Sequence, residues 1–394
     1  MTPHALTDIR VIDVTDDLGA YAGRLLVDLG AEVVRIEPPG GSSTRKQHPL
    51  VDVDGTTISA YDAFVNAGKR SVVIDATSPA DRATLERLLG TADIVIQSPG
   101  ASLETFGVDV DRLHELNPGV GNVVVSPFGE GATGAPEPAD DLLVMAAGGL
   151  LHLGGYPDLG PRVAYGGQSR FAASIFAAVA AIVAVLERDR GERGGDYDVS
   201  AQECIAQALE DSASTYALTG HVRERQGDRP REAGSGIYPC ADGHVSMIAG
   251  RLGTARAWTA LVGWLNEAQS PGADELLAPE WTSFEYRQSE AAIERFGELF
   301  AAFAKTRTKQ ELYAEAQRRM IALSPVSTID DVLANEQLRH RGFFTEVSLG
   351  SRSAVFPRAP YRLSATPASD PRPAPGLGDA DDGLVAGLAV GSLS

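Results

Sequence analysis

The sequence is poor in the residues that build disulfide frameworks and metal sites. Its 394 residues include two cysteines, Cys204 and Cys240, which are typical of a reduced cytosolic pair rather than a disulfide framework. The seven histidines are scattered without the spacing of metal ligands, so no metal site is expected. The motifs G-x-x-x-x-G-K-S/T, H-E-x-x-H and G-x-S-x-G do not occur, and no internal repeat is found.

Positive charge is also scarce. The chain has 34 lysines and arginines against 53 acidic residues, a formal net charge of −19, and only four of its residues are lysines. This charge argues against nucleic acid or an anionic membrane as the main partner. An anionic ligand would need a local basic site to overcome the acidic field.

No apolar run reaches the length of a membrane span. Residues 171 to 186 are apolar except for Ser174, and these sixteen residues fall short of the roughly 20 needed to cross hydrocarbon. A helix that is apolar on every side and does not span a membrane is buried, so we expect a central core helix. The N-terminus MTPHALTDIRVIDV has no apolar core of signal-peptide length, which indicates a cytoplasmic protein.

The first half of the chain alternates strand and helix patterns. Residues 8–14 and 32–37 are rich in β-branched residues and flank a helix pattern at 22–29, which together predict a βαβ unit and a parallel sheet. The polar stretch 42–60 is expected to be an irregular surface loop. The remaining predicted elements are strands at 72–75, 93–97 and 122–126, and helices at 78–89, 111–116 and 142–151.

Several stretches spread over about residues 7 to 378 resemble one enzyme family. They are GAYAGRLLVDLGAEVVRIEPPGG from Gly19, NAGKRS from Asn66, DVSAQE from Asp198, YPCADG from Tyr238, RGFF from Arg341 and PYRLS from Pro360. This pattern is similar to the family III CoA-transferases and the related α-methylacyl-CoA racemases.

The resemblance implies a fold and a domain arrangement. We expect an α/β protein with a Rossmann-like large domain built from both chain ends, an inserted small α+β domain, and two such chains interlocked as a dimer. Residues 1–220 would form the first part of the large domain. Residues 221–324 would form the small domain with its linkers, and 325–394 the return to the large domain and the C-terminal tail.

The residue that carries the family's chemistry differs here. In the family, an aspartate just before the central helix carries the acyl group as a mixed anhydride. Counting back from Asp198 places Ser169 there, preceded by Gln168 and followed by Arg170 as the neighbouring candidate. A serine without a neighbouring base is a poor nucleophile. We therefore expect Ser169 to cap the central helix, or to bond a substrate carbonyl beside Gln168, rather than to carry an acyl group.

Carboxylates elsewhere could take over the chemistry. The racemases of this group have a His-Asp pair where this chain has Asp140 and Asp141, so racemisation by a His-Asp dyad is not expected. Asp140, Asp141, Asp16 and Asp17 remain candidate catalytic residues. The alternative for each pair is capping of a helix N-terminus, where the dipole favours an acid.

The resemblance also implies coenzyme A as a substrate, with no covalently bound cofactor. The turn containing Leu18 would contact the thioester end, and the segment that begins at Pro38 would lie near the adenine end. Lys69, with Arg70, would contact a phosphate or the pantetheine; the alternative is a solvated basic pair. Thr105 stands where the family usually has a basic residue, so weak CoA binding is expected.

Three functions remain open. The first is a CoA-transferase-type enzyme acting on acyl-CoA by an altered mechanism. The second is a catalytically inactive subunit paired with an active homologue. The third is an isomerase, hydrolase or lyase on the same scaffold. The expected partners are an acyl-CoA or carboxylic acid substrate and a second chain, as a homodimer or as a heterodimer with an active homologue, with no nucleic acid and no membrane.

Overall fold

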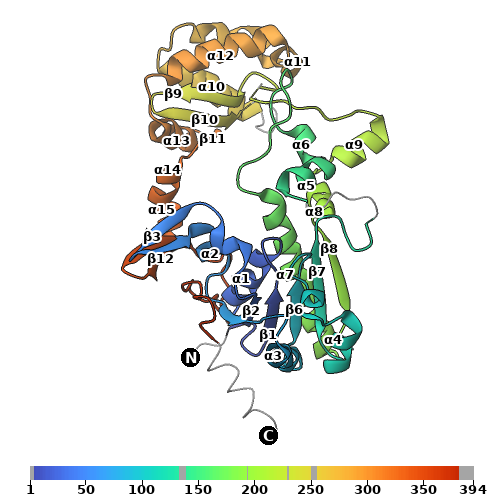
Figure 1. Ribbon diagram of the computed structural model, residues 1–394. Coiled ribbons are helices and arrows are strands. Elements are labelled where there is room, and N and C mark those ends of the chain that lie inside the picture. The colour runs from blue at the N-terminus through green and yellow to red at the C-terminus, as the bar shows by residue number, and fades with distance from the viewer. Residues whose placement is uncertain (1–3, 133–138, 193, 229, 250–254, 381–394) are drawn as a thin grey trace. The chain divides into compact units, whose positions relative to one another are not determined.

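The chain divides into two compact units (Figure 1). The large unit takes the chain up to Gly154, from Pro161 to Glu224, and from Glu336 onward. The small unit takes Gly155–Gly160 and Arg225–Asn335, so its return boundary lies beyond the linker at 324 that the sequence predicts. The computed structural model describes residues 4–132, 139–192, 194–228, 230–249 and 255–380.

A parallel sheet of six strands forms the centre of the large unit, in the order β5-β2-β1-β6-β7-β8. The predicted α/β class with a parallel sheet is therefore confirmed. The strand order reverses between β1 and β6, and open α/β sheets bind ligands beyond the carboxyl ends of the strands at this point. The strands are β1 (Arg10–Val14), β2 (Glu32–Glu37), β5 (Arg70–Val73), β6 (Ile94–Gln97), β7 (Gly121–Ser126) and β8 (Asp196–Ser200).

Helices cover both faces of this sheet. Successive side chains of a strand point to opposite faces, and both faces here carry buried apolar residues. Val11 faces one buried cluster with α1 and α7, and the adjacent Ile12 faces another with α3 and α4. Polar caps set several helix starts; Ser78, for example, accepts the Asp81 N–H at the predicted start of α3. The helices are α1 (Ala20–Asp28), α2 (Ala60–Val65), α3 (Pro79–Leu89), α4 (Val110–Leu116), α5 (Asp141–Ala147), α6 (Leu150–Leu153), α7 (Gln168–Asp189), α8 (Ala201–Gln207), α9 (Ser212–Thr219), α15 (Glu336–His340) and the 3-10 turn η2 (Leu103–Phe106).

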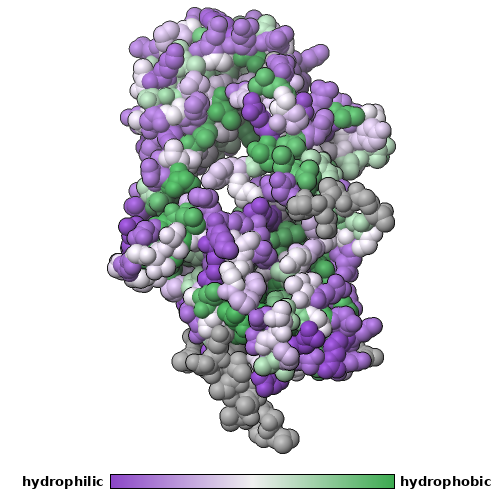
Figure 2. All heavy atoms as spheres, in the orientation of Figure 1, coloured by the Kyte–Doolittle hydropathy of each residue, from purple (hydrophilic) through white to green (hydrophobic). Residues whose placement is uncertain are grey.

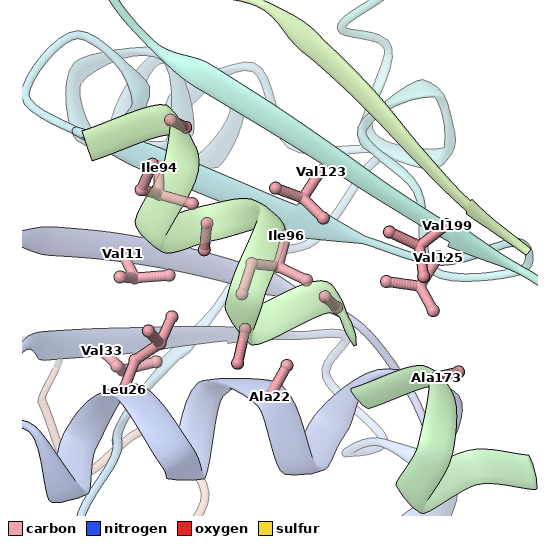
Figure 3. Close-up of a cluster of buried hydrophobic side chains, with 14 of the residues drawn as sticks. Val11, Ala22, Leu26, Val33, Ile94, Ile96, Val123, Val125, Ala173 and Val199 are labelled. Carbon is pink, nitrogen blue, oxygen red and sulfur yellow. The ribbon is translucent and has the colours of Figure 1, made fainter. Parts of the chain in front are cut away.

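The central helix α7 approaches the sheet closely through its alanine face. It has 22 residues, more than the sixteen of the predicted apolar run. Ala173 and its neighbours pack with Val11, Ile96 and Val123 in one core cluster (Figure 3). A Cβ at Gly121 of β7 would lie 2.5 Å from the Ala184 Cβ, so only glycine allows this approach. The small residues thus bring helix and sheet together.

The opposite face of α7 is apolar and exposed in the single chain. Ile175, Phe176, Val179, Val183 and Leu186 retain between 39% and 51% of their accessible surface. The expectation of a helix buried on every side is therefore wrong for one chain. By length and composition α7 could cross a membrane. Its packed alanine face makes it a core helix of this unit.

Two local predictions are wrong. The stretch 42–60 is not an irregular loop, because it contains a 3-10 turn and a hairpin that reverses at Asp54-Gly55, both with positive φ. Asp-Gly is a strong hairpin signal. The helix predicted at 142–151 breaks into α5 and α6 at Gly148 and Gly149, where φ is +87° at the second glycine. The elements of the stretch 42–60 are η1 (Ser43–Lys46), β3 (Leu50–Val53) and β4 (Thr56–Ser59).

The small unit packs helices against a three-stranded antiparallel sheet, β11-β10-β9. Its core is rich in aromatic residues, including Trp258 stacked on Trp281 and Tyr238 against Phe300. Its elements are β9 (Ser235–Cys240), β10 (Gly243–Ile248), β11 (Ala322–Pro325), α10 (Ala255–Glu267), α11 (Phe284–Arg287), α12 (Glu290–Ala304), α13 (Lys309–Arg318), α14 (Ile329–Ala334) and the turns η3 (Ala273–Leu277) and η4 (Pro279–Thr282).

The chain then re-enters the large unit through α15. A two-stranded antiparallel hairpin follows, made of β12 (Phe344–Leu349) and β13 (Arg352–Pro357). After the hairpin the chain returns to the sheet, where the Gly378 N–H donates to Ser71 Oγ of β5 at 3.1 Å. Both ends of the chain therefore contribute to the large unit.

Candidate active site

The turn after β1 lies at the carboxyl edge of the sheet, where the strand order reverses. The Asp16 N–H donates to Ser98 Oγ, just after β6, at 3.3 Å. The Asp16 carboxylate accepts the Ser43 N–H of η1 at 2.7 Å. Asp16 therefore ties the ends of β1 and β6 to the segment after β2. Its carboxylate acts as a local hydrogen-bond acceptor for the backbone.

Asp17, the next residue, forms an ion pair with the start of the central helix. Its Oδ2 lies 2.8 Å from Arg170 Nη1, and its Oδ1 accepts the Tyr61 hydroxyl at 2.8 Å. Burial and the Asp17 charge raise the pKa of Tyr61, so the phenol stays protonated as a donor. Arg170 also approaches Gln47 Oε1 at 3.5 Å. Asp17, Arg170 and Tyr61 thus form one polar cluster at this edge.

Ser169 is buried and bonded to Asp141. Its N–H and its hydroxyl both donate to Asp141 Oδ1, at 2.8 and 2.7 Å, and the residue keeps 1% of its accessible surface. This contact joins α5 to α7. The N-cap of α7 is Gly167, in the left-handed region, so the expectation that Ser169 caps the helix is wrong. The Gly166-Gly167 turn starts the helix earlier than the apolar pattern indicates.

Gln168 and Asp140, the sequence neighbours of Ser169 and Asp141, make local contacts. The Gln168 side chain is exposed and its Nε2 donates to the Tyr165 carbonyl at 2.7 Å. The Asp140 carboxylate accepts the Leu143 N–H at 3.1 Å and caps α5. Asp140 and Asp141 therefore act at one helix start, but only Asp141 reaches α7.

Lys69 is enclosed within the large unit. Its ammonium donates to Asp13 Oδ2 at 2.6 Å, the Ala20 carbonyl at 2.7 Å and Asn66 Oδ1 at 2.8 Å, and its side chain is 0% exposed. An ammonium has three donors, and these contacts use all of them. Lys69 therefore has no free donor for a phosphate, so the predicted CoA contact would require one of these three hydrogen bonds to break.

A glycine makes room for this buried pair. A Cβ at Gly23 of α1 would lie 2.5 Å from Asp13 Oδ2 and 2.8 Å from Lys69 Cε. Burial lowers the pKa of Lys69, and the Asp13 carboxylate opposes this shift. The sequence signal at 66–71 thus marks a structural lysine that links β1, α1 and the segment before β5.

Arg70 lies at the other end of the sheet. It is the first residue of β5 and pairs with Glu32, the first residue of β2, at 2.6 Å. Because the strands are parallel, their first residues share the amino edge, opposite the turn that contains Asp17. Leu18 and the exposed Pro38 do lie at the carboxyl edge, since they follow β1 and β2. The predicted CoA contact of Arg70 therefore lies at the edge of the sheet opposite Leu18 and Pro38.

A buried polar network supports the carboxyl end of β2. Glu37 Oε1 lies 2.6 Å from Arg45 Nη2 and also accepts the Ser71 hydroxyl at 2.6 Å. Burial acts to raise the pKa of Glu37, but the hydrogen bonds from Arg45 and the charge of Arg35 outweigh it and lower the pKa to about 2. The predicted adenine-end segment therefore starts from a rigid, ionised anchor.

A pocket of about 300 Å³ opens at the carboxyl ends of β6 and β7. Gln97, Ser98 and Ser126 line it together with Glu104 and Glu130, and no lysine or arginine is among its described lining residues. Burial and nearby carboxylates, chiefly Asp198, raise the pKa of Glu130. Thr105, at the position where the family usually has a basic residue, follows Glu104 of this acidic pocket, and the acidic lining disfavours a phosphate.

Sequence reasoning missed two members of the site. Arg170 was weighed only as a neighbour of Ser169, and its pairing with Asp17 joins residues far apart in the chain. Tyr61 follows the stretch 42–60, and no local pattern marks it as a partner of Asp17. Among the residues that the structure describes, no group of three His, Cys, Asp or Glu side chains could hold a metal ion.

Comparison with known proteins identifies the family. The sequence model of the family described as "CoA-transferase family III" matches residues 6–381 of this chain. The chain belongs to CoA-transferase family III. It is thus an enzyme of a transferase family whose substrates are CoA thioesters and carboxylic acids, as the sequence resemblance indicates.

Relatives and solved structures agree over nearly the whole chain. Succinyl-CoA:(R)-benzylsuccinate CoA-transferase subunit BbsE of Thauera aromatica is 33% identical, over 94% of this chain and 91% of that protein. Succinyl-CoA–D-citramalate CoA-transferase of Chloroflexus aurantiacus is 31% identical, over 95% and 92%. A CAIB/BAIF family protein from Brucella suis shares the fold of this family III chain with a TM-score of 0.86, at 24% identity, over 98% of this chain and 100% of that one.

Proposed function

We propose that this chain is a subunit of a succinyl-CoA-dependent CoA-transferase, that it carries no acyl group itself, and that it pairs with a homologous chain that does. The observation that carries the proposal is the start of α7. There Ser169 is buried against Asp141, and Arg170 is paired with Asp17. Neither residue can serve as a free carboxylate at the place where the family's acyl carrier is expected.

The chemistry of Ser169 supports this proposal. A carboxylate carrier attacks the thioester carbonyl, forms a mixed anhydride and releases CoA thiolate. The thiolate then attacks the carrier's own carbonyl in the anhydride, which releases the donor acid and leaves CoA on the carrier for transfer to the acceptor acid. A serine ester would be far less reactive, so attack by the thiolate would stall. Asp141 accepts a hydrogen bond from the Ser169 hydroxyl, but that hydroxyl is too enclosed to meet a thioester.

The names of relatives support a succinyl-CoA substrate and a multi-chain enzyme. The benzylsuccinate relative is named as a subunit, and so is the succinyl-CoA–L-malate CoA-transferase alpha subunit of Chloroflexus aurantiacus, which is 28% identical over 95% of this chain. Both names combine succinyl-CoA with a dicarboxylic acid, benzylsuccinate in one and L-malate in the other. We extend these features to this chain as part of the proposal.

The exposed apolar face of α7 supports pairing with a second chain. Four of its five residues, Ile175, Val179, Val183 and Leu186, recur every three or four positions, and Phe176 lies next to the first. Leu142 and Leu143 of α5 are also exposed. Figure 2 shows hydrophobic residues on the surface over α5 and α6. An apolar stripe of this length is typical of an interface. We propose that the chains interlock, because each chain leaves the large unit and later returns to it.

A cytoplasmic location remains part of the proposal. Cys204 and Cys240 are both free thiols, and burial raises the pKa of Cys204 to about 11. Unpaired cysteines of this kind suit a reducing compartment.

The test compares the chain alone with a mixed assembly. The purified chain is incubated with succinyl-CoA and labelled succinate, and exchange and acylated peptides are measured. We expect neither, whereas co-expression with a homologue from the same genome that keeps an aspartate at the position of Ser169 should give both, with the adduct on that homologue only. Exchange by the purified chain alone would overturn the proposal.

A second candidate is a self-sufficient transferase that uses Asp17. The Asp17 side chain is 19% exposed and lies at the carboxyl edge, where the thioester is expected. Its carboxylate would attack the thioester carbonyl, form an anhydride and release CoA thiolate. In that case Asp17→Asn would abolish exchange by the chain alone, while Asp140→Asn would preserve it. An acylated Asp17 peptide would establish this candidate.

A further inference from the structure

A second pocket lies in the C-terminal part of the large unit, apart from the carboxyl edge of the sheet. It has a volume of about 530 Å³, and its lining includes Arg341, Arg358 and Arg362 together with Phe343 and Tyr361. Three of the chain's 34 basic residues therefore meet in one cavity of a protein with a net charge of −19. None of its described lining residues is an aspartate or a glutamate.

The three guanidinium groups are held mainly by neutral oxygens. Arg358 donates to the Gly342 carbonyl at 2.9 Å and pairs with Asp370 at 2.8 Å, just outside the lining. Arg341 donates to the Pro360 carbonyl at 3.5 Å, and Arg362 donates to the Arg341 carbonyl. These contacts orient the side chains but neutralise only one of the three charges.

Two charges therefore lack a compensating partner. Among the described residues, neither Arg341 nor Arg362 has a carboxylate within ion-pair distance. Arg341 and Arg362 are exposed, so water rather than a carboxylate solvates their charges, and an anion can approach both guanidinium groups from solvent. Arginine also matches phosphate geometry, because its planar fork donates two parallel hydrogen bonds.

The pocket is distinct from the proposed CoA-thioester site. The Ser369 N–H, in the pocket wall, donates to the carbonyl of Asp28 at 2.7 Å. Asp28 is the last residue of α1, so this wall lies at the end of the helix opposite the Asp17 turn. A ligand here would not compete with one at the carboxyl edge.

We propose that this pocket binds a phosphate-bearing small molecule, with its phosphate between Arg341 and Arg362 and its remaining part against Tyr361 and Phe343. Two adjacent guanidinium groups fit a diphosphate better than a single carboxylate. The aromatic rings offer an apolar surface beside the charged groups. This site is independent of the proposed subunit role.

Calorimetric titration of the purified protein with inorganic pyrophosphate tests the site. We expect binding that weakens as salt rises, and the double substitution Arg341→Gln with Arg362→Gln should reduce the affinity about tenfold or more through lost charge-assisted contacts. The control is Arg352→Gln, which removes a charge from an exposed position of β13 outside the lining and should leave the affinity unchanged. Circular dichroism checks that the variants are folded, and each single substitution provides a milder variant.

Three results would overturn the inference. The first is no pyrophosphate binding at millimolar concentration, and the second is equal binding by wild type and the folded variants. The third is a change in oligomeric state without a change in affinity, which would assign the arginines to a subunit interface. Titration with succinate distinguishes a phosphate ligand from a carboxylate ligand. If succinate binds as tightly as pyrophosphate and with the same dependence on Arg341 and Arg362, the ligand of this pocket is a carboxylate and not a phosphate.

Discussion

Arg170 and Asp17 form an ion pair of 2.8 Å between the start of α7 and the turn after β1. These are the two places where the family III resemblance puts the acyl carrier and the thioester contact. A cation paired with a carboxylate here holds the helix against the turn. It also leaves the start of α7 without the free carboxylate that a covalent transferase needs.

Exchanging the charges of this pair should preserve it. Arg170→Asp alone places two carboxylates together, and we expect the free energy of unfolding to fall by about 1–3 kcal/mol because one acid must be desolvated or protonated. Adding Asp17→Arg should restore part of the loss. Urea unfolding at neutral pH measures both. If the double variant loses the sum of the two single-variant losses in free energy of unfolding, the Asp17–Arg170 pair contributes no interaction energy to stability.

Ser169 should act as a structural link between α5 and α7. We expect Ser169→Ala to lower the free energy of unfolding by about 1–3 kcal/mol, because a hydrogen bond to a charged acceptor is lost. Ser174→Ala is the matched control, since its buried hydroxyl has no hydrogen-bond partner among the described residues. An acyl ester on Ser169 after incubation with succinyl-CoA, found by peptide mass spectrometry, would contradict this role.

Lys69 should matter for stability rather than for CoA affinity. Lys69→Met leaves the buried Asp13 carboxylate unpaired, and breaking such a pair costs about 3–5 kcal/mol. Adding Asp13→Asn should recover part of the loss, because the uncompensated charge disappears. Arg70→Ala, at an exposed pair, should cost about 0–1 kcal/mol. If the folded Lys69→Met protein binds CoA more weakly and its stability is unchanged, that result would support the CoA phosphate contact that the sequence predicts for Lys69.

Glu37 should make stability sensitive to acid. The pKa of Glu37 is about 2 in the folded chain, against 4.5 for an ordinary glutamate, so as pH falls the unfolded state binds a proton before the folded state does. Its contribution is complete above pH 4.5 and is lost progressively as pH falls from 4.5 towards 2. Urea unfolding at several pH values should show a shallower acid dependence for Glu37→Gln.

The exposed face of α7 should be required for assembly. We expect Val179→Asp with Val183→Asp to prevent dimer formation, because two charges would be buried at an apolar interface. Ala83→Asp, on an exposed position of α3, adds the same charge outside the stripe and should not alter assembly. Equilibrium sedimentation measures the oligomeric state. A stable folded monomer of the wild-type chain on dilution would argue against interlocking.

Local sequence patterns determined much of the fold. The strand at 32–37, the Ser78-Pro79 helix start and the alternation of strands with helices depend on neighbouring residues, and the structure has them where they were predicted. The Asp54-Gly55 hairpin is also encoded locally, because Asp-Gly favours a tight turn, although the polar composition of 42–60 predicts a loop. The family III motifs, spread along the chain, determined the family. Backbone periodicity and capping act over a few residues, so one sequence suffices to read them.

Only the tertiary structure decided which charged groups meet. Lys69 and Arg70 are adjacent in sequence, but one is enclosed against Asp13 and the other lies at the amino edge with Glu32. The partners Asp17 and Arg170 come from opposite ends of the sheet-forming segment. Such pairings depend on the order of the strands and the packing of α7 on the sheet. Whether a basic residue binds a ligand or a buried carboxylate is therefore decided by distant segments that no local pattern records.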